Sequence, residues 1–229
     1  MAGWTATDIE IVFLSLKVAT VATVATAPIA LALALALARG RFPGRGLLNA
    51  LVHLPLVVPP VVTGYTLLRV FGRHGLVGEW LGDTFGIVVA FRWTGAALAA
   101  GVMGLPLMVR AMQLAIENVD RSLEHAAATL GASPGWRFAT ITLPLATPGV
   151  IAGLILGFAK AMGEFGATIT FVSNIPGETR TLALAIFGLV ETPGGDAAAL
   201  RLVWLSIAVS LGALLVSEWL ARRMRHDRG

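Results

Sequence analysis

The 229-residue sequence contains no cysteine and few charged residues. Without cysteine the chain cannot form disulfides or use a thiolate as a nucleophile or metal ligand. Charged residues make up 13% of the chain, whereas roughly a quarter is typical of a soluble domain. Hydrophobic residues account for 56%, and the mean hydropathy is +0.81. These values predict a protein whose surroundings are mainly lipid.

Motifs for nucleotide binding, hydrolysis and metal ligation are also lacking. The two lysines, Lys17 and Lys160, do not follow a G-x-x-x-x-G-K-[ST] loop, so no phosphate-binding loop for ATP is present. The PGGD run is similar to an intramembrane aspartate motif, but Asp196 is expected in a polar, glycine-rich loop, which disfavours an intramembrane protease. We expect no catalytic residue, metal ligand or cofactor in this chain. The four histidines are scattered and form no H-E-x-x-H motif: His53, His74, His125 and His226.

Five apolar stretches are long enough to cross a membrane as helices, for which about 20 residues are needed. They cover residues 9–38, 47–68, 87–109, 147–172 and 202–221. A sixth stretch, 182–190, would reach only about 14 Å as a helix, so we expect an interfacial or re-entrant segment there. The pI of about 10.6 could indicate nucleic-acid binding, but the arginines flank the apolar runs, which is typical of membrane orientation.

The basic residues predict how the chain is oriented. No lysine or arginine precedes Lys17, and Asp8 and Glu10 stand where a signal peptide would be basic. The first stretch is therefore expected to be an uncleaved helix with its N-terminus outside. Ten basic residues then lie inside and two within spans, which agrees with the positive-inside rule and predicts an inside C-terminus. The five outside are Arg69, Arg73, Arg92, Arg180 and Arg201.

The segment between the third and fourth stretches carries turn and capping signals. Asp120 or Ser122 can cap a short helix, and Gly131 can end it in the left-handed conformation. A Ser-Pro pair then begins a second short helix, which Pro144 is expected to end. The row of alanines beside a glycine would let another surface approach closely. The segment either packs on its own protein or docks a cytoplasmic partner, and its size and apolar content favour docking.

Two charged residues fall inside the fourth stretch. Lys160 and Glu164 are four residues apart, so on a helix they would share a face and could form an ion pair. Charges at membrane depth are costly and face a cavity or a partner. The pair either gates a passage or fixes the span against its neighbours, and a bare carboxylate would repel an anionic cargo. Nearby small or hydroxyl-bearing residues are candidates for the passage or for helix packing: Gly163, Gly166, Thr168 and Thr170.

Prolines and a turn cluster mark two more positions. Pro59 and Pro60 interrupt the second stretch and predict a kink, which is either simply tolerated or shapes a passage. The SNIPGETRT run after the fourth stretch predicts an external turn, either a plain loop or part of an outer gate. Its candidate residues are Asn174, Pro176, Gly177, Glu178 and Arg180.

The helix-turn-helix segment resembles the cytoplasmic loop of permease subunits of bacterial ABC importers. That pattern is Glu-Ala-Ala, a glycine four residues after the second alanine, and Ile-x-Leu-Pro after nine intervening residues. His125 stands at the acidic position and Glu124 lies one residue earlier, so whether Glu124 makes the family's acidic contact stays open. We expect His125 to be exposed on its helix. The matching residues are Ala126, Ala127, Gly131, Ile141, Leu143 and Pro144.

Four further runs extend the resemblance over essentially the whole chain. They resemble molybdate permeases, and sulfate and tungstate permeases share much of them. The runs are HLPLVVPPVVTGY at 53–65, LPLMVRAMQ at 105–113, GEFGATITFVSNIPGETRT at 163–181 and TPGGD at 192–196.

The resemblance implies an all-α integral membrane protein with the type I ABC importer permease fold. It implies one domain over residues 1–229, about five transmembrane helices, and coupling helices at about 117–146 that sit in clefts of two cytoplasmic ATPase subunits. Those subunits would hold ATP and magnesium. The permease would be a homodimer in the bacterial inner membrane, would receive an oxyanion from an extracytoplasmic binding protein through its outer turn, and would bind no nucleic acid.

Other functions remain as alternatives. Selectivity among molybdate, tungstate and sulfate would rest mainly with the binding protein, so this chain does not decide between them. A stand-alone secondary transporter or channel is disfavoured by the small size and the lack of a visible inverted repeat. A membrane scaffold or enzyme subunit is disfavoured by the docking pattern.

Overall fold

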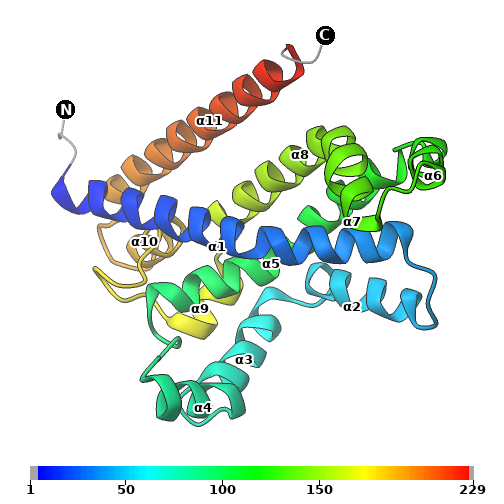
Figure 1. Cartoon of the computed structure of the whole chain (residues 1–229). Helices are drawn as coiled ribbons and strands as arrows, with labels where there is room; N and C mark the ends of the chain where they lie inside the picture. Colours follow the sequence, from blue (N-terminus) through cyan, green and yellow to red (C-terminus); the bar gives the residue numbers. More distant parts are fainter. Residues whose placement is uncertain (1–4, 227–229) are drawn as a thin grey trace.

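The computed structural model describes residues 5–226, and every regular element in that range is a helix. This confirms the expected all-α class. The elements, shown in Figure 1, are α1 (Ala6–Arg39), α2 (Arg45–Val57), α3 (Pro60–Phe71), α4 (Leu76–Phe85), α5 (Trp93–Glu117), α6 (Arg121–Thr129), α7 (Pro134–Arg137), the π-helical turn η1 (Phe138–Thr142), α8 (Leu143–Met162), α9 (Gly166–Val172), α10 (Leu182–Val190) and α11 (Asp196–His226).

Helices α1 and α5 run side by side through the middle of the molecule, and α8 packs against α5 (Figure 1). The start of α1 lies near α10 and the start of α11, and the start of α5 packs on α9. We call this end the α9 pole. The last turns of α1 lie at the opposite end near α6 and α7, which we call the α6 pole. The central helices thus connect the two ends of the molecule.

Small residues let the central helices approach closely. A Cβ added to Gly101 of α5 would lie 2.6 Å from Oγ1 of Thr26 in α1. A Cβ on Gly157 of α8 would lie 2.5 Å from the sulfur of Met108 in α5. Because lipid gives helices no hydrophobic reason to associate, such close van der Waals packing is one of the main contributions that hold membrane helices together.

The structure supports five membrane spans, but not five straight ones. Four helices are long and apolar enough to cross a membrane, and the α2–α3 pair makes a fifth if it is counted as one broken span. The pair bends by 111° at the predicted prolines, where Pro59 precedes α3 and Pro60 is its first residue. The kink is confirmed, and it divides the predicted 47–68 span into two helices.

Three other predicted boundaries need correction. The third span begins at Trp93, because Arg92 is extended (φ −126°, ψ 160°) and its charge therefore lies before the helix. The fourth span stops at Met162, and a break separates it from α9. The fifth begins at Asp196, which is the first residue of α11 and not a loop residue. An acidic side chain is favourable at that position because it meets the positive end of the helix dipole.

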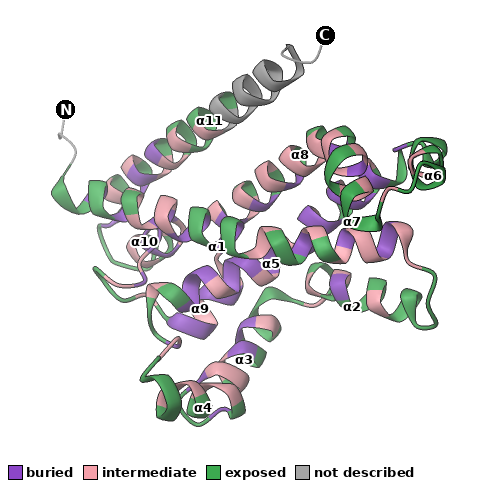
Figure 2. Cartoon of the chain, in the orientation of Figure 1, coloured by how far each residue is buried: buried purple, intermediate pink, exposed green. Residues whose placement is uncertain are grey.

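Burial is concentrated in the centre of the bundle (Figure 2). The most apolar part of α5 is 67% buried, whereas the corresponding part of α11 is only 17% buried. Helices α2 and α3 likewise expose leucines, valines and the single tyrosine, Tyr65. In a water-soluble protein so much exposed apolar surface would be unfavourable. It suits helices that face lipid or other subunits.

Candidate functional site

The predicted helix-turn-helix lies at the α6 pole and is built from the expected capping residues. Asp120 caps α6 by accepting a hydrogen bond from the backbone N–H of Ser122 at 2.8 Å, and this bond holds the pKa of Asp120 below its ordinary value. Gly131 has φ +86°, so it supplies the left-handed turn. Oγ of Ser133 then accepts from the N–H of Trp136 at 3.3 Å and caps α7.

The predicted end of the second helix at Pro144 is wrong. Helix α7 continues through the η1 turn directly into α8, and Pro144 lies in the first turn of α8. Proline lacks an N–H, and here it directly follows the π-helical turn, in which the N–H of Leu143 donates to the oxygen of Phe138 and the regular α-helical hydrogen-bond pattern is already interrupted. The segment is therefore continuous with a long span, so a displacement of α7 would also move α8.

Glu124 attaches α6 to the rest of the protein. Its Oε1 accepts hydrogen bonds from Nη2 of Arg39 at 3.0 Å and from the hydroxyl of Thr142 at 2.7 Å. Nη2 of Arg39 also donates to the backbone oxygen of Val119 at 3.0 Å. The carboxylate thus joins the end of α1, helix α6 and the η1 turn. Arg39 and Thr142 were not predicted as partners of Glu124, although a basic residue in the last turn of the first span was a usable signal.

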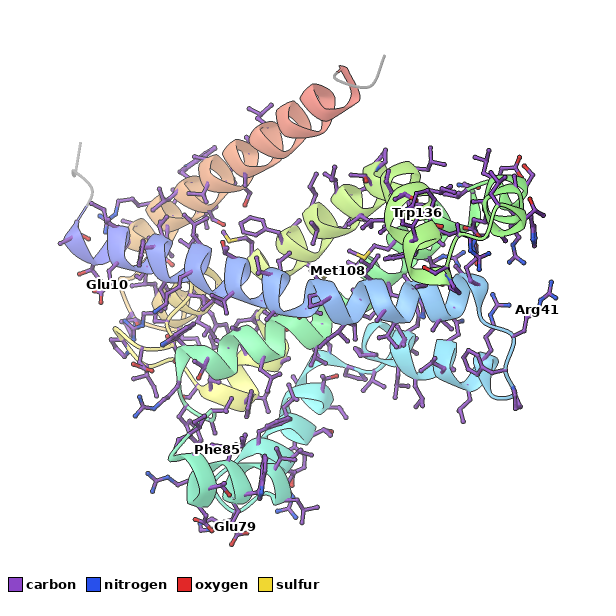
Figure 3. The ribbon with its side chains drawn as sticks, in the orientation of Figure 1. Glu10, Arg41, Glu79, Phe85, Met108 and Trp136 are labelled. Carbon is purple, nitrogen blue, oxygen red and sulfur yellow. The ribbon has the colours of Figure 1, made fainter. Side chains whose placement is uncertain are left out.

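The opposite side of this segment is exposed and partly apolar. His125 and Ala126 are exposed and Ala127 is half-buried. The side chain of Leu130 is 88% exposed, and Trp136, labelled in Figure 3, is also exposed. The remaining motif residues, Ile141, Leu143 and Pro144, are half-buried at the junction with α8.

The predicted ion pair inside the membrane-spanning region is present, at a break in the backbone. Nζ of Lys160 lies 2.7 Å from Oε2 of Glu164, whose side chain is almost fully buried. Oε1 of Glu164 accepts from the N–H of Ala167 at 2.9 Å. Helix α8 ends at Met162 and Gly163 follows as its cap, so the two charges do not share one helix. The pair instead fastens α9 to the end of α8.

Two of the other residues proposed for a passage, Gly166 and Pro60, pack against each other. A Cβ on Gly166 would lie 2.7 Å from Cβ of Pro60, which brings the α8–α9 break against the bend that follows Pro59. The hydroxyls of Thr168 and Thr170 donate to backbone oxygens within their own turns, at 2.8 and 2.9 Å. Thr168 is also buried. These contacts fit the helix-packing alternative.

The predicted outer turn is held by hydrogen bonds within the chain. Nδ2 of Asn174 donates to a backbone oxygen of α10 at 2.9 Å, and its Oδ1 accepts from Nε of Arg180 at 3.0 Å. Oε1 of Glu178 accepts from the first N–H of α5 at 3.4 Å. Pro176 and Gly177, which has φ +77°, form the exposed tip. These bonds attach the turn to α5 and α10 at the α9 pole.

Two contacts at this pole were not predicted. Thr179 is fully buried, and its hydroxyl donates to the backbone oxygen of Ser173 and accepts from the N–H of Ile175, both at 2.9 Å. Nζ of Lys17 lies 3.7 Å from the ring centre of Trp93, a cation–π contact. Within residues 5–226 no cluster of three or more histidine, aspartate or glutamate side chains could hold a metal ion.

Comparison with known proteins identifies a family for this chain. The family model described as binding-protein-dependent transport system inner membrane component matches residues 28–226. The molybdenum transport system permease protein ModB of Escherichia coli K12 is 56% identical over 221 residues, which are 96% of each chain. The sulfate transport system permease protein CysT of the same organism is 40% identical over 174 residues, 76% of this chain and 62% of that protein.

Solved structures agree with the fold. A chain from a bacterial ABC transporter that imports the acidic polysaccharide alginate matches with a TM-score of 0.77 at 16% identity. The match covers 96% of this chain and 80% of the other. At that identity the likeness concerns the fold alone.

Proposed function

The chain belongs to the family of binding-protein-dependent transport system inner membrane components, and on that premise we propose that it conducts molybdate as the permease subunit of an ATP-driven importer. The observation that carries the proposal is the 56% identity, over nearly the full length, with a molybdenum transport permease. The sulfate permease is less similar and matches a smaller share of the chain, so molybdate is favoured over sulfate. The relatives are transport permeases of a multi-pass membrane family, not enzymes.

The α6–α7 segment is the proposed contact with a partner ATPase. Its exposed face combines a protruding leucine, Leu130, with Trp136 and a row of alanines. An exposed apolar group of this kind favours coverage by another protein. Glu124 is directed toward its own chain, so in this proposal it positions α6 while His125, Ala126 and Gly131 approach the ATPase.

Two further partners complete the proposed complex. A second copy of this chain would cover part of the exposed apolar surface of α2 and α3. An extracytoplasmic binding protein would contact the tip of the outer turn at Pro176 and Gly177. This tip is exposed, and the turn is attached to α10 by the hydrogen bond of Asn174. Lys160 and Glu164 would act as a fastening of the gate region and not as anion ligands, because the carboxylate is buried and would repel a dianion.

Reconstitution tests the proposal. The permease, its ATPase subunits and the binding protein would be placed in lipid vesicles, and uptake of molybdate, tungstate and sulfate would be measured with each anion loaded on the binding protein. We expect ATP-dependent uptake that is fastest for molybdate and abolished by an ATPase subunit unable to hydrolyse ATP. Uptake that persists without ATP would point to a secondary transporter, and faster sulfate uptake would overturn the molybdate assignment.

A further inference from the structure

A basic cavity of about 780 Å³ opens where α3 ends and α5 begins. Its walls come from the last turns of α3, the turn that leads into α4, and residues 88–92 just before α5. It is lined by three arginines and one histidine, and the single tyrosine of the chain stands at its edge. These five residues are Arg69, Arg73, His74, Arg92 and Tyr65.

The arginines of this cavity are not neutralised by the protein. Within residues 5–226, none of Arg69, Arg73 and Arg92 makes an ion pair, whereas three arginines elsewhere do. All three are exposed, so their charges are available to a ligand. The described contacts therefore leave three guanidinium groups facing one hollow without a carboxylate bound to any of them.

Acidic groups do lie in the neighbourhood, but they belong to other surfaces. Glu79 and Asp83 line an adjacent pocket on α4, which shares Arg73 and His74 with the basic cavity. Figure 3 shows Glu79 pointing away from the bundle at the outer edge of α4. Glu178 is bound to the first N–H of α5, beside Arg92. The residues that line the cavity itself are basic, aromatic, aliphatic or glycine, and none is a carboxylate, so its charge is positive.

These arginines are predicted to lie on the side of the membrane where basic residues are disfavoured. In the predicted orientation all three lie outside, against the preference for basic residues on the inner side. The cavity also lies at the start of α5. At about 1.5 Å per residue this helix extends about 37 Å, and the α6 pole lies beyond its other end. Charges kept at an unfavourable place, concentrated in one hollow, favour a role in binding.

We infer that this cavity is an outer vestibule that binds the tetrahedral oxyanion between its release from the binding protein and its passage through the membrane. The inference rests on the proposed function and adds a site to it. Guanidinium groups offer paired N–H donors that match the oxygens of such an anion. A hollow lined by one sign of charge also concentrates the opposite ion.

The exposure of the arginines sets the strength of this site. Solvent screens charges on exposed side chains, so each guanidinium attracts the anion less than it would in a buried site. Weak attraction suits a vestibule, because the anion must leave it again. From the cavity, α3 leads back to the bend after Pro59, which packs on α9 beside the Lys160–Glu164 pair. The vestibule therefore lies at one end of the helix whose other end reaches the proposed gate.

A direct binding measurement uses the single tyrosine. Because Tyr65 is the only tyrosine, 3-fluorotyrosine labelling of the permease, assembled with unlabelled ATPase subunits, gives one ¹⁹F signal at the cavity. We expect molybdate and sulfate to shift this signal saturably, while sodium chloride at equal ionic strength does not. The triple variant Arg69→Gln/Arg73→Gln/Arg92→Gln should lose the shift, and the matching triple lysine variant should keep most of it. A non-saturating shift, or one unchanged in the glutamine variant, would overturn the vestibule.

Transport gives a second, independent readout. At low ionic strength we expect the triple glutamine variant to import molybdate about tenfold more slowly, a loss typical of electrostatic steering. The difference should shrink in high salt. The control is Arg41→Gln, an exposed arginine at the α6 pole (Figure 3). Stimulation of ATP hydrolysis by loaded binding protein shows whether the triple variants are folded, and if the glutamine variant fails this check the three single glutamine variants replace it.

The outcomes separate this inference from the proposed function. A wild-type complex that shows the saturable shift without ATP-dependent uptake would support the vestibule and contradict the transport proposal. A complex that transports without any shift would overturn the vestibule alone. A third outcome is that no complex, wild type included, shows the ¹⁹F shift, and that the glutamine variant binds the binding protein less tightly. In that case the arginines dock an acidic protein surface, and the oxyanion site is wrong.

Discussion

Glu124 is the residue at which the end of α1, helix α6 and the η1 turn meet. Replacing it by glutamine removes the charge that Arg39 and Thr142 bind, and we expect the free energy of unfolding to fall by about 1.5–3 kcal/mol, as for other hydrogen bonds to charged groups. Thermal unfolding of the purified permease would measure it. Glu191→Gln, at an exposed carboxylate after α10, is the control.

The same variant decides the open question about Glu124. If the carboxylate positions α6, Glu124→Gln and Arg39→Gln should be non-additive in a double-mutant cycle on the permease alone. If it instead contacts the ATPase directly, the permease alone should be as stable as wild type while binding to the ATPase subunits weakens. That second result would contradict the anchoring role.

Lys160 neutralises a carboxylate that is almost fully buried. We expect Lys160→Ala to destabilise the permease by about 3 kcal/mol, the lower end for breaking a buried pair, because the lysine itself is partly exposed. The Lys160→Ala/Glu164→Gln double variant should recover part of the loss, since no charge is then left unpaired. Unfolding in detergent measures both. An alanine variant as stable as Lys160→Arg would show that the pair does not fasten α9.

At the scale of elements, two substitutions at Gly131, in the turn between α6 and α7, can separate the effect of turn geometry from the effect of charge. Asparagine and aspartate both tolerate the left-handed conformation that φ +86° requires, and they are nearly identical in shape. We expect Gly131→Asn to keep ATP-driven uptake and Gly131→Asp to lose most of it, because the added charge meets the ATPase surface. Equal uptake by the two variants, with intact ATPase binding, would contradict a coupling role for this turn.

Elements were predictable where the signal was local. Helix caps at Asp120 and Ser133, the turn at Gly131 and the kink at Pro59 depend on residues next to them in sequence. The 111° angle of the α2–α3 bend was not, because packing of α3 on α9 helps to set it. The break at Glu164 was missed because an i,i+4 pair also fits an unbroken helix.

The other features that were not predicted from the sequence depend on contacts between residues far apart in the chain. Glu124 and Arg39 are 85 residues apart, and no local pattern pairs them. Arg69, Arg73 and Arg92 were predicted to lie outside, but only the fold brings them to one cavity. Pro144 was predicted as a stop because a proline often ends a helix, but in the structure it lies at the start of one.

At the scale of the whole molecule, the absence of cysteine makes the orientation directly measurable. Single-cysteine variants Arg73→Cys and Arg41→Cys would each carry the only thiol in the chain. With an outside N-terminus, a membrane-impermeant maleimide should label Arg73→Cys on intact cells and Arg41→Cys only after permeabilisation. The reverse pattern would contradict the predicted orientation and move the basic cavity to the inner side.

The first helix is fastened by residues near the other end of the chain. Asp8, which is buried, pairs with Arg201 at 3.1 Å, and Oγ of Ser15 accepts from the N–H of Leu182 at 2.8 Å. During synthesis α1 leaves the ribosome first, so these partners are still missing while the middle helices insert. The central helix therefore cannot acquire all its native contacts until α11 has been made. A chain that stops short of Arg201 leaves Asp8 without its ion-pair partner and Ile11 without the α11 leucines, Leu202 and Leu205, that pack in the same cluster, so the first helix completes its packing only when the last one is in place.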